Sequence, residues 1–159
     1  MEDYLNRLHL RNEENTDRLD YNCGGYAFET YSWYSPGDFS EDEDSVSSFL
    51  LNIMDSDLYY EVDIPELLFD FCIEGILKTF PTYKRISEEE ARCLPLSTKI
   101  IAFRTYFEDF GDYDYHFKVR KNGIWSHKRG SSKIKECTLE KWSYIGCSYN
   151  SPTAYFVER

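Results

Sequence analysis

The sequence is short of basic residues and of long apolar runs. Its 159 residues hold 18 lysines and arginines against 29 aspartates and glutamates, a formal net charge of −11. Phosphate contacts need clustered Lys and Arg, so this balance argues against direct binding of nucleic acid or an anionic membrane surface. No stretch approaches the roughly 18 consecutive apolar residues of a membrane span, so we expect no membrane association.

Metal and disulfide patterns are missing as well. There are three histidines, and the five cysteines lie far apart with no C-x-x-C pair, so no zinc-type cluster can be drawn. An odd number of widely spaced cysteines indicates free thiols in a reducing compartment. The N-terminal stretch MEDYLNRLHLRNEEN has no apolar core of a secretory signal. We therefore expect a cytoplasmic protein, in the host cytoplasm if a phage encodes it.

What the sequence does contain is typical of one folded domain over residues 1–159, because aromatics make up 18% and hydrophobic residues 42% of the chain. The acidic segment at 35–45 is expected to be a solvated loop. Helices are predicted at 45–54 and 64–80, the second with a face of Leu67, Leu68, Phe71, Cys72 and Leu77. Strands are predicted at 98–107, 115–120, 123–128, 143–147 and 154–158. Helices first and an antiparallel sheet second make an α+β arrangement.

Asn122-Gly123 is the strongest local signal, because this dipeptide accepts the positive φ angles of a two-residue hairpin turn. Such a turn pairs residues whose numbers add up to about 245. His116 and His127 would then be diagonal neighbours, within reach if they share a face. One imidazole could take a thiol proton while the other fixes its tautomer. The alternative is two half-exposed strand histidines with no chemical role.

Cys23 is the candidate nucleophile. It stands before Gly24 and Gly25, which leave space beside the thiol, and before a plausible helix GYAFETY. A helix N-terminus favours the thiolate and offers N–H groups to a developing oxyanion. The alternative is that Gly-Gly forms a tight turn and Cys23 is an inert core residue.

These residues resemble a family. The order of a helix-initial Cys, a distant His that opens a strand and a polar residue about a dozen positions later is similar to the NlpC/P60 branch of papain-like cysteine hydrolases. The stretches YNCGGYA and DYHFKVRKNGIWSHKRG also resemble a group of uncharacterised bacterial and phage proteins. The resemblance implies a papain-like fold of NlpC/P60 type, with N-terminal helices packed on an antiparallel sheet.

The resemblance also implies a chemistry. Cys23 would be the nucleophile, His116 the base and His127 the orienting residue of a hydrolase or acyl transferase. It would cleave a peptide, isopeptide or amide bond through a thioester, with no metal or organic cofactor. Tyr21, or a backbone amide near Cys23, would help to hold the oxyanion. Trp125 alternates with His127 on its strand and would either wall the substrate cleft or fill the core.

A second reading gives the acidic surface the main role. Family members that act on cell walls carry an export signal or a wall-binding domain, and we find neither pattern in the sequence. The acidic residues 38–44 also have no part in the resemblance. The alternative function is a phage-type inhibitor without catalysis, whose acids occupy a basic, nucleic-acid-binding surface of a host defence protein.

Overall fold

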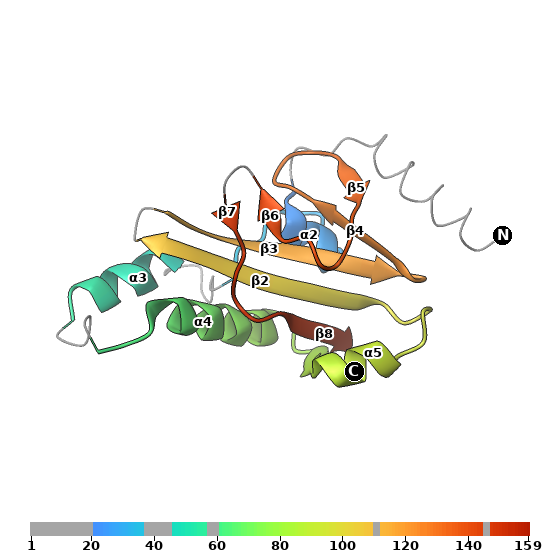
Figure 1. Cartoon of the computed structure of the whole chain (residues 1–159), viewed down its shortest axis with the longest axis horizontal. Helices are drawn as coiled ribbons and strands as arrows, with labels where there is room; N and C mark the ends of the chain where they lie inside the picture. Colours follow the sequence, from blue (N-terminus) through green and yellow to red (C-terminus); the bar gives the residue numbers. More distant parts are fainter. Residues whose placement is uncertain (1–20, 37–45, 57–60, 110–111, 145–146) are drawn as a thin grey trace.

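A computed structural model describes residues 21–36, 46–56, 61–109, 112–144 and 147–159 (Figure 1). The acidic segment at 38–44 and the N-terminal stretch discussed above lie outside these ranges. The described part has the predicted α+β composition, with helices before most of the strands. None of its helices has the length and apolar character needed to cross a membrane.

Six strands of the described residues form one open antiparallel sheet in the order β1-β8-β2-β3-β4-β5. Their bounds are β1 Tyr83–Ile86, β2 Ile100–Asp109, β3 Asp112–Lys121, β4 Ile124–Lys128, β5 Ile134–Glu136 and β8 Ala154–Glu158. The strand predicted at 143–147 is instead two short strands, β6 Ser143–Tyr144 and β7 Cys147–Ser148, which pair with each other. The sequence did not predict β1 or β5, which form the two edges of the sheet.

Four helices accompany the sheet: α2 Cys23–Ala27, α3 Val46–Met54, α4 Ile64–Thr79 and α5 Glu88–Cys93. The predictions for α3 and α4 are confirmed to within a residue at each end. Local chemistry explains where α4 begins, because the Asp63 carboxylate caps it and Pro65 occupies its first turn. α5 was missed, although Ser87 and Glu90 form a capping box at its start.

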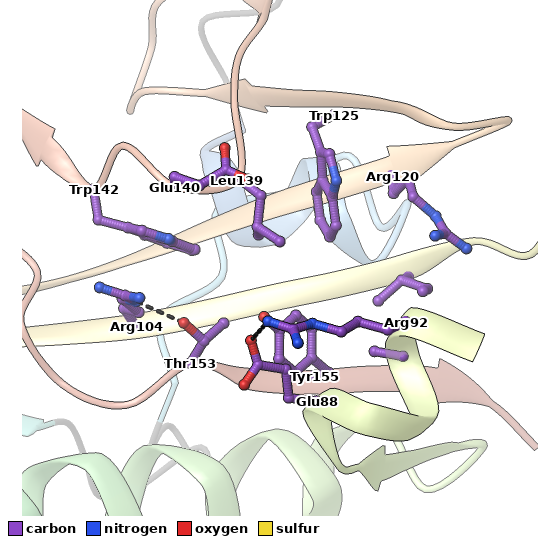
Figure 2. Close-up of a pocket in the computed structure, with 12 residues that line it drawn as sticks. Glu88, Arg92, Arg104, Arg120, Trp125, Leu139, Glu140, Trp142, Thr153 and Tyr155 are labelled. Carbon is purple, nitrogen blue, oxygen red and sulfur yellow. Dashed lines mark hydrogen bonds and ion pairs between the residues drawn. The ribbon is translucent and has the colours of Figure 1, made fainter. Parts of the chain in front are cut away.

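Strand alternation gives the sheet two apolar faces, each with its own core. On one face Ile101 and Phe103 of β2 pack with Phe117 of β3 beneath α2 and α4. On the other face Ile100 and Ala102 pack with a set of aromatic residues, among which Trp142 and Tyr155 surround a cavity (Figure 2). The sheet is therefore buried on both sides over much of its length.

The face of α4 was predicted only in part. Leu68 and Cys72 are buried as expected. Leu67, Phe71 and Leu77 are only half-buried, and Phe69, Ile73 and Ile76 complete the buried stripe instead. The reason is that α4 is apolar over more than half of its circumference, so that its pattern alone does not decide which side meets β2.

The predicted hairpin is confirmed. Asn122 and Gly123 have φ angles of 48° and 82°, which are the positive values that a two-residue hairpin turn requires. Val119 pairs with Ser126 and Lys121 with Ile124, the register expected from the turn. Because this register determines which β3 and β4 side chains are neighbours, it decides where the two strand histidines lie.

Candidate active site

Cys23 lies at the start of a helix, as predicted, but α2 ends at Ala27 and does not run through the predicted segment GYAFETY to Tyr31. The side chain of Asn22 holds the start of α2 in place. Asn22 Oδ1 accepts from the backbone N–H groups of Gly25 and Tyr34, both at 3.1 Å. Its Nδ2 donates to the carbonyl oxygen of Tyr34 at 2.8 Å and to the Tyr115 hydroxyl at 3.0 Å. Asn22 is 3% exposed. One buried amide therefore caps α2 and ties it to the segment around Tyr34 and to β3.

The two glycines after Cys23 make room for the chain that returns past α2. A Cβ on Gly24 would lie 2.7 Å from Tyr34 Cδ1, and one on Gly25 would lie 2.0 Å from the Ser32 carbonyl oxygen. Real Cβ atoms do not approach other atoms so closely, so both positions need glycine. The interpretation that these glycines leave space beside the thiol is therefore corrected, because the space is filled by residues 32–34.

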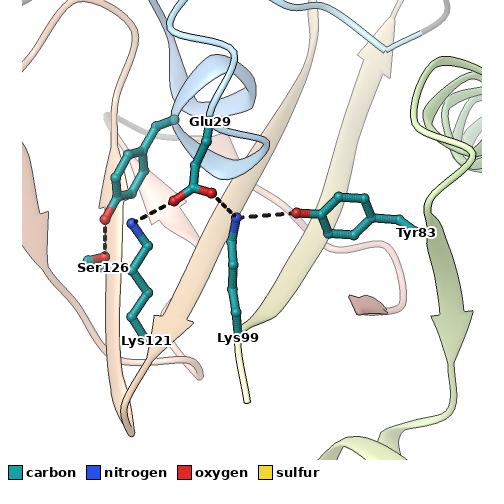
Figure 3. Close-up of polar contacts among 6 residues, drawn as sticks. Glu29, Tyr83, Lys99, Lys121 and Ser126 are labelled. Carbon is teal, nitrogen blue, oxygen red and sulfur yellow. Dashed lines mark hydrogen bonds and ion pairs between the residues drawn. The ribbon is translucent and has the colours of Figure 1, made fainter. Parts of the chain in front are cut away.

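The other end of α2 is held by charges (Figure 3). The Glu29 carboxylate lies 3.4 Å from the ammonium groups of both Lys99 and Lys121. Within α2, the Tyr26 hydroxyl lies 2.6 Å from Ser126 Oγ on β4. A helix of only five residues is not stable by itself. These contacts and the burial of all five residues hold α2 against β3 and β4.

Cys23 and His116 line the same cavity, which measures about 450 Å³. The remaining lining residues are Asn22, Trp33, Asp114, Tyr115, Arg129, Gly130, Ser131, Ser132 and Tyr149. The pairing of β3 with β4 ends at Val119 and Ser126. The cavity lies beyond this end, beside β3, and the backbone N–H of Phe117 donates to the Cys23 sulfur there. The thiol thus meets the strand at the residue next to His116.

The two predicted histidines are in contact. His116 Nε2 lies 2.9 Å from His127 Nδ1, and the ring centroids are 5.0 Å apart. His116 is 3% exposed, and Tyr149 and Trp142 pack against its ring. Because His127 occupies Nε2, Nδ1 is the nitrogen of His116 that is left for a proton from a thiol. His127 thus orients the ring of His116, which agrees with the order of these residues in the sequence.

Burial shifts the pKa values of the Cys23 thiol and of both imidazoles. Burial raises the pKa of Cys23 to about 12. The hydrogen bond from the Phe117 N–H lowers this pKa by less than burial raises it, and the negative charge of Asp114 raises it further. Burial and the neighbouring His127 and Arg129 hold the pKa of His116 well below its ordinary value. Burial likewise lowers the pKa of His127 to about 4.

The expectation that the start of α2 lowers the thiol pKa is therefore wrong for the resting protein. Loss of water around a buried sulfur outweighs the N–H groups and the dipole of a five-residue helix. The cavity is lined by a neutral thiol and a neutral imidazole, not by a thiolate and an imidazolium. This arrangement leaves His116 able to accept a proton, which an imidazolium could not do.

Asp114 and Tyr149 belong to the same cavity, and the sequence reading assigned them no clear part in it. The Tyr149 hydroxyl donates to Asp114 Oδ2 at 2.6 Å, and the Tyr149 ring packs on His116. Alternation along β3 was the available signal, because it puts Asp114 and His116 on the same side of the strand.

No family model, curated protein or solved structure matches this chain. The interpretation of the cavity therefore depends on its own geometry. Among the described residues no group of three His, Cys, Asp or Glu side chains could hold a metal ion. The side chains that line the cavity with Cys23 include His116, Asp114 and Tyr149, which can transfer protons or form hydrogen bonds.

The remaining site predictions lie elsewhere. Tyr21 is 2% exposed, its ring packs edge-on against Tyr31, and its carbonyl oxygen accepts from Lys128. Trp125 lines a different cavity, which Trp142 also lines and His116 does not. Neither residue is among those that line the Cys23 cavity. Trp33 is, and with 58% of its surface exposed it is the aromatic residue placed to meet a substrate.

Proposed function

We propose that the protein is a papain-like thiol hydrolase or acyl transferase of NlpC/P60 type that acts on a peptide, isopeptide or amide bond. The observation that carries the proposal is the 2.9 Å contact between His116 Nε2 and His127 Nδ1, beside the cavity that Cys23 and His116 share. Three residues far apart in the sequence would form a nucleophile, a base and an orienting group.

The reaction begins from the neutral pair. As a substrate carbonyl enters the cavity, His116 Nδ1 takes the Cys23 proton while the sulfur attacks the carbonyl carbon. The backbone N–H groups of Cys23 and Gly24, which face the sulfur at the start of α2, donate to the oxygen that becomes negative. His116 then gives its proton to the leaving amine, and a thioester remains on Cys23.

The second half of the reaction releases the acyl group. Water gives hydrolysis and an amine gives transfer. In either case His116 accepts a proton from the incoming nucleophile and returns it to the Cys23 sulfur as the carbon–sulfur bond breaks, which restores the neutral pair. His127 keeps the His116 ring in one tautomer through its Nδ1 contact and does not touch the substrate. No metal or organic cofactor enters any of these steps. The substrate side chains would contact Trp33 and the Arg129 side of the cavity.

The test uses p-nitrophenyl esters of N-acetyl amino acids as acyl donors. Mass spectrometry of the intact protein and of its peptides should find one acyl group, on Cys23. His116→Ala should slow acylation about a hundredfold or more, the usual contribution of a positioned base. Cys93→Ser is the matched control, because Cys93 is an exposed thiol away from the cavity. Acylation that survives in Cys23→Ser at the wild-type rate contradicts the proposal.

A second function is favoured by the low exposure of Cys23, which is 5%. Here the protein binds a basic partner and performs no chemistry. The exposed acids Glu66, Asp70 and Glu74 on one side of α4 would contribute to the binding surface. If Cys23→Ser keeps every biological effect of the wild-type protein while a triple Gln variant of these acids loses it, binding is the function. The opposite pattern supports catalysis.

A further inference from the structure

A second cavity, of about 360 Å³, lies on the face of the sheet that carries Ile100 (Figure 2). It is lined by Glu88, Ala91, Arg92, Ile100, Arg104, Arg120, Trp125, Leu139, Glu140, Trp142, Thr153 and Tyr155. Trp142 and Arg104 lie at one end, Arg120 lies at the other, and Trp125 stands between them. In a protein with a net charge of −11, three arginines around one cavity are unexpected.

Trp142 brings an unsatisfied donor to this cavity. Its side chain is 5% exposed, and its indole Nε1 has no hydrogen-bond partner. A buried indole N–H normally finds an acceptor, because leaving it unpaired costs free energy. The Arg104 guanidinium and the Lys118 ammonium lie over the two-ring system, at 5.2 Å and 4.4 Å from the ring centre. The N–H and the Arg104 guanidinium therefore make this end of the cavity electropositive, whereas Lys118 contacts the ring system but is not among the residues that line the cavity.

Arg120 brings a second unsatisfied donor and a buried charge. It is 8% exposed, and its Nη2 donates to the carbonyl oxygens of Pro95 at 2.8 Å and Thr98 at 3.2 Å. Its Nε has no partner. No carboxylate of the described residues forms an ion pair with Arg120, and burial lowers its pKa. Buried charges are normally paired, so the Arg120 guanidinium is suited to meet an anion.

Two carboxylates line the cavity, Glu88 and Glu140, and neither forms an ion pair with Arg120. Glu88 lies 2.9 Å from Arg92, and both side chains of this pair are well exposed. Arg104 donates to Thr153 Oγ1 and to the Tyr149 carbonyl oxygen, which are neutral acceptors. The cavity thus keeps an excess of positive charge between flat apolar walls from Trp125 and Tyr155.

We propose that this cavity binds a small organic anion with a planar ring. The anionic group would accept from Trp142 Nε1 and the Arg104 guanidinium at one end of the cavity, the ring would lie against Trp125 and Tyr155, and an acceptor on the ring would meet Arg120 Nε at the other end. A carboxylate and a phosphate are both suited to arginine, whose fork of N–H groups matches their oxygens. Trp142 also packs on His116, but neither Cys23 nor His116 lines this cavity, and the proposal does not depend on Cys23 being a nucleophile.

The test is calorimetric titration of the whole chain with two ring anions and one ring without charge. Indole-3-carboxylate and adenosine monophosphate represent the carboxylate and phosphate sources, and adenosine is the neutral ring. We expect one of the anions to bind with one site per chain and adenosine to bind at least tenfold more weakly. Trp142→Phe keeps the apolar ring and removes only the N–H, and Arg120→Gln removes the buried charge. Each should weaken binding about tenfold, the effect of one lost charge-assisted hydrogen bond.

Matched controls separate the site from general effects. Trp33→Phe makes the same exchange at the other cavity, and Arg85→Gln removes an exposed arginine elsewhere. Both should bind like the wild type. If Arg120→Gln does not fold, as judged by its melting curve, Trp142→Phe alone decides. Failure of both anions to bind at millimolar concentration, equal binding of adenosine, or unchanged binding by Trp142→Phe overturns the proposal.

Discussion

Asn22 is the residue whose loss should reveal most about how the candidate site is built. Asn22→Ala removes four hydrogen bonds from a side chain that is 3% exposed. Loss of the helix cap costs about 1 kcal/mol. The backbone N–H and C=O of Tyr34 lose their Asn22 partners too, and each such buried hydrogen bond is worth about 1 kcal/mol. We therefore expect the free energy of unfolding to fall by about 3 kcal/mol.

The assay is urea denaturation followed by circular dichroism, with thermal unfolding beside it. For a domain of about this size, 3 kcal/mol corresponds to a fall in melting temperature of about 10 °C. Asn22→Asp separates the two halves of the amide, because it keeps the acceptor for Gly25 and Tyr34 but loses both donated bonds. At neutral pH it should be at least as destabilising as Asn22→Ala, because a buried carboxylate oxygen would face the Tyr34 carbonyl oxygen. Asn52→Ala, at an exposed position of α3, is the control and should change stability by less than about 0.5 kcal/mol. A loss below about 1 kcal/mol in Asn22→Ala would refute the role assigned to this side chain.

The remaining predictions concern the thiol, the histidines and the glycines. Because the pKa of Cys23 is raised to about 12, iodoacetamide should label Cys23 more slowly than exposed Cys93 at pH 7, as followed by mass spectrometry. The labelling rate of Cys23 should still be rising at pH 10. A labelling rate that levels off near pH 8 would show a lowered pKa instead. The pKa of His127 falls from 6.5 to about 4 on folding, so the unfolded chain binds more protons between these values and stability should decrease as pH falls from 6.5 towards 4. Urea unfolding at several pH values should show this decrease, and His127→Gln should reduce it; a pH-independent stability over that window contradicts it. Gly25→Ala would put a Cβ 2.0 Å from the Ser32 carbonyl oxygen and should cost about 2 kcal/mol or more. A Cβ on Gly130 would meet no atom within 4 Å, and only the φ of 52° disfavours alanine there. Gly130→Ala should therefore lower the free energy of unfolding by about 1 kcal/mol, as measured by calorimetry. Equal losses of stability in Gly25→Ala and Gly130→Ala would refute the steric argument.

The hairpin and the histidine pair could be predicted because they depend on local chemistry. Asn122-Gly123 determines the turn, the turn determines the register, and the register brings His116 to His127. The start of α2 at Cys23 was likewise readable from the residues around it. These are short-range relations, and they need no knowledge of the rest of the fold.

Properties that depend on burial could not be predicted in the same way. The pKa of Cys23 was expected to fall because its immediate neighbours favour a thiolate, yet the whole surrounding structure removes water and raises it. Trp125 does share a strand face with His127, but it lines another cavity than Cys23, and Trp142 and Tyr149 from a later segment pack on His116. Contacts made by residues distant in the chain leave no periodic signal in the sequence.

The position of β8 has a consequence for the order in which the protein folds. β2, β3 and β4 follow one another along the chain and pair with their sequence neighbours, so they can form early at a small entropic cost. β8 lies between β1 and β2, and it is the last of the described strands (Figure 1). Until it arrives, β1 has no strand to pair with and one edge of β2 is open. The pairing of β8 with β1 and β2 is thus a late, long-range step, which favours slow folding. Before this step, the unpaired edges of β1 and β2 can pair with strands of other chains.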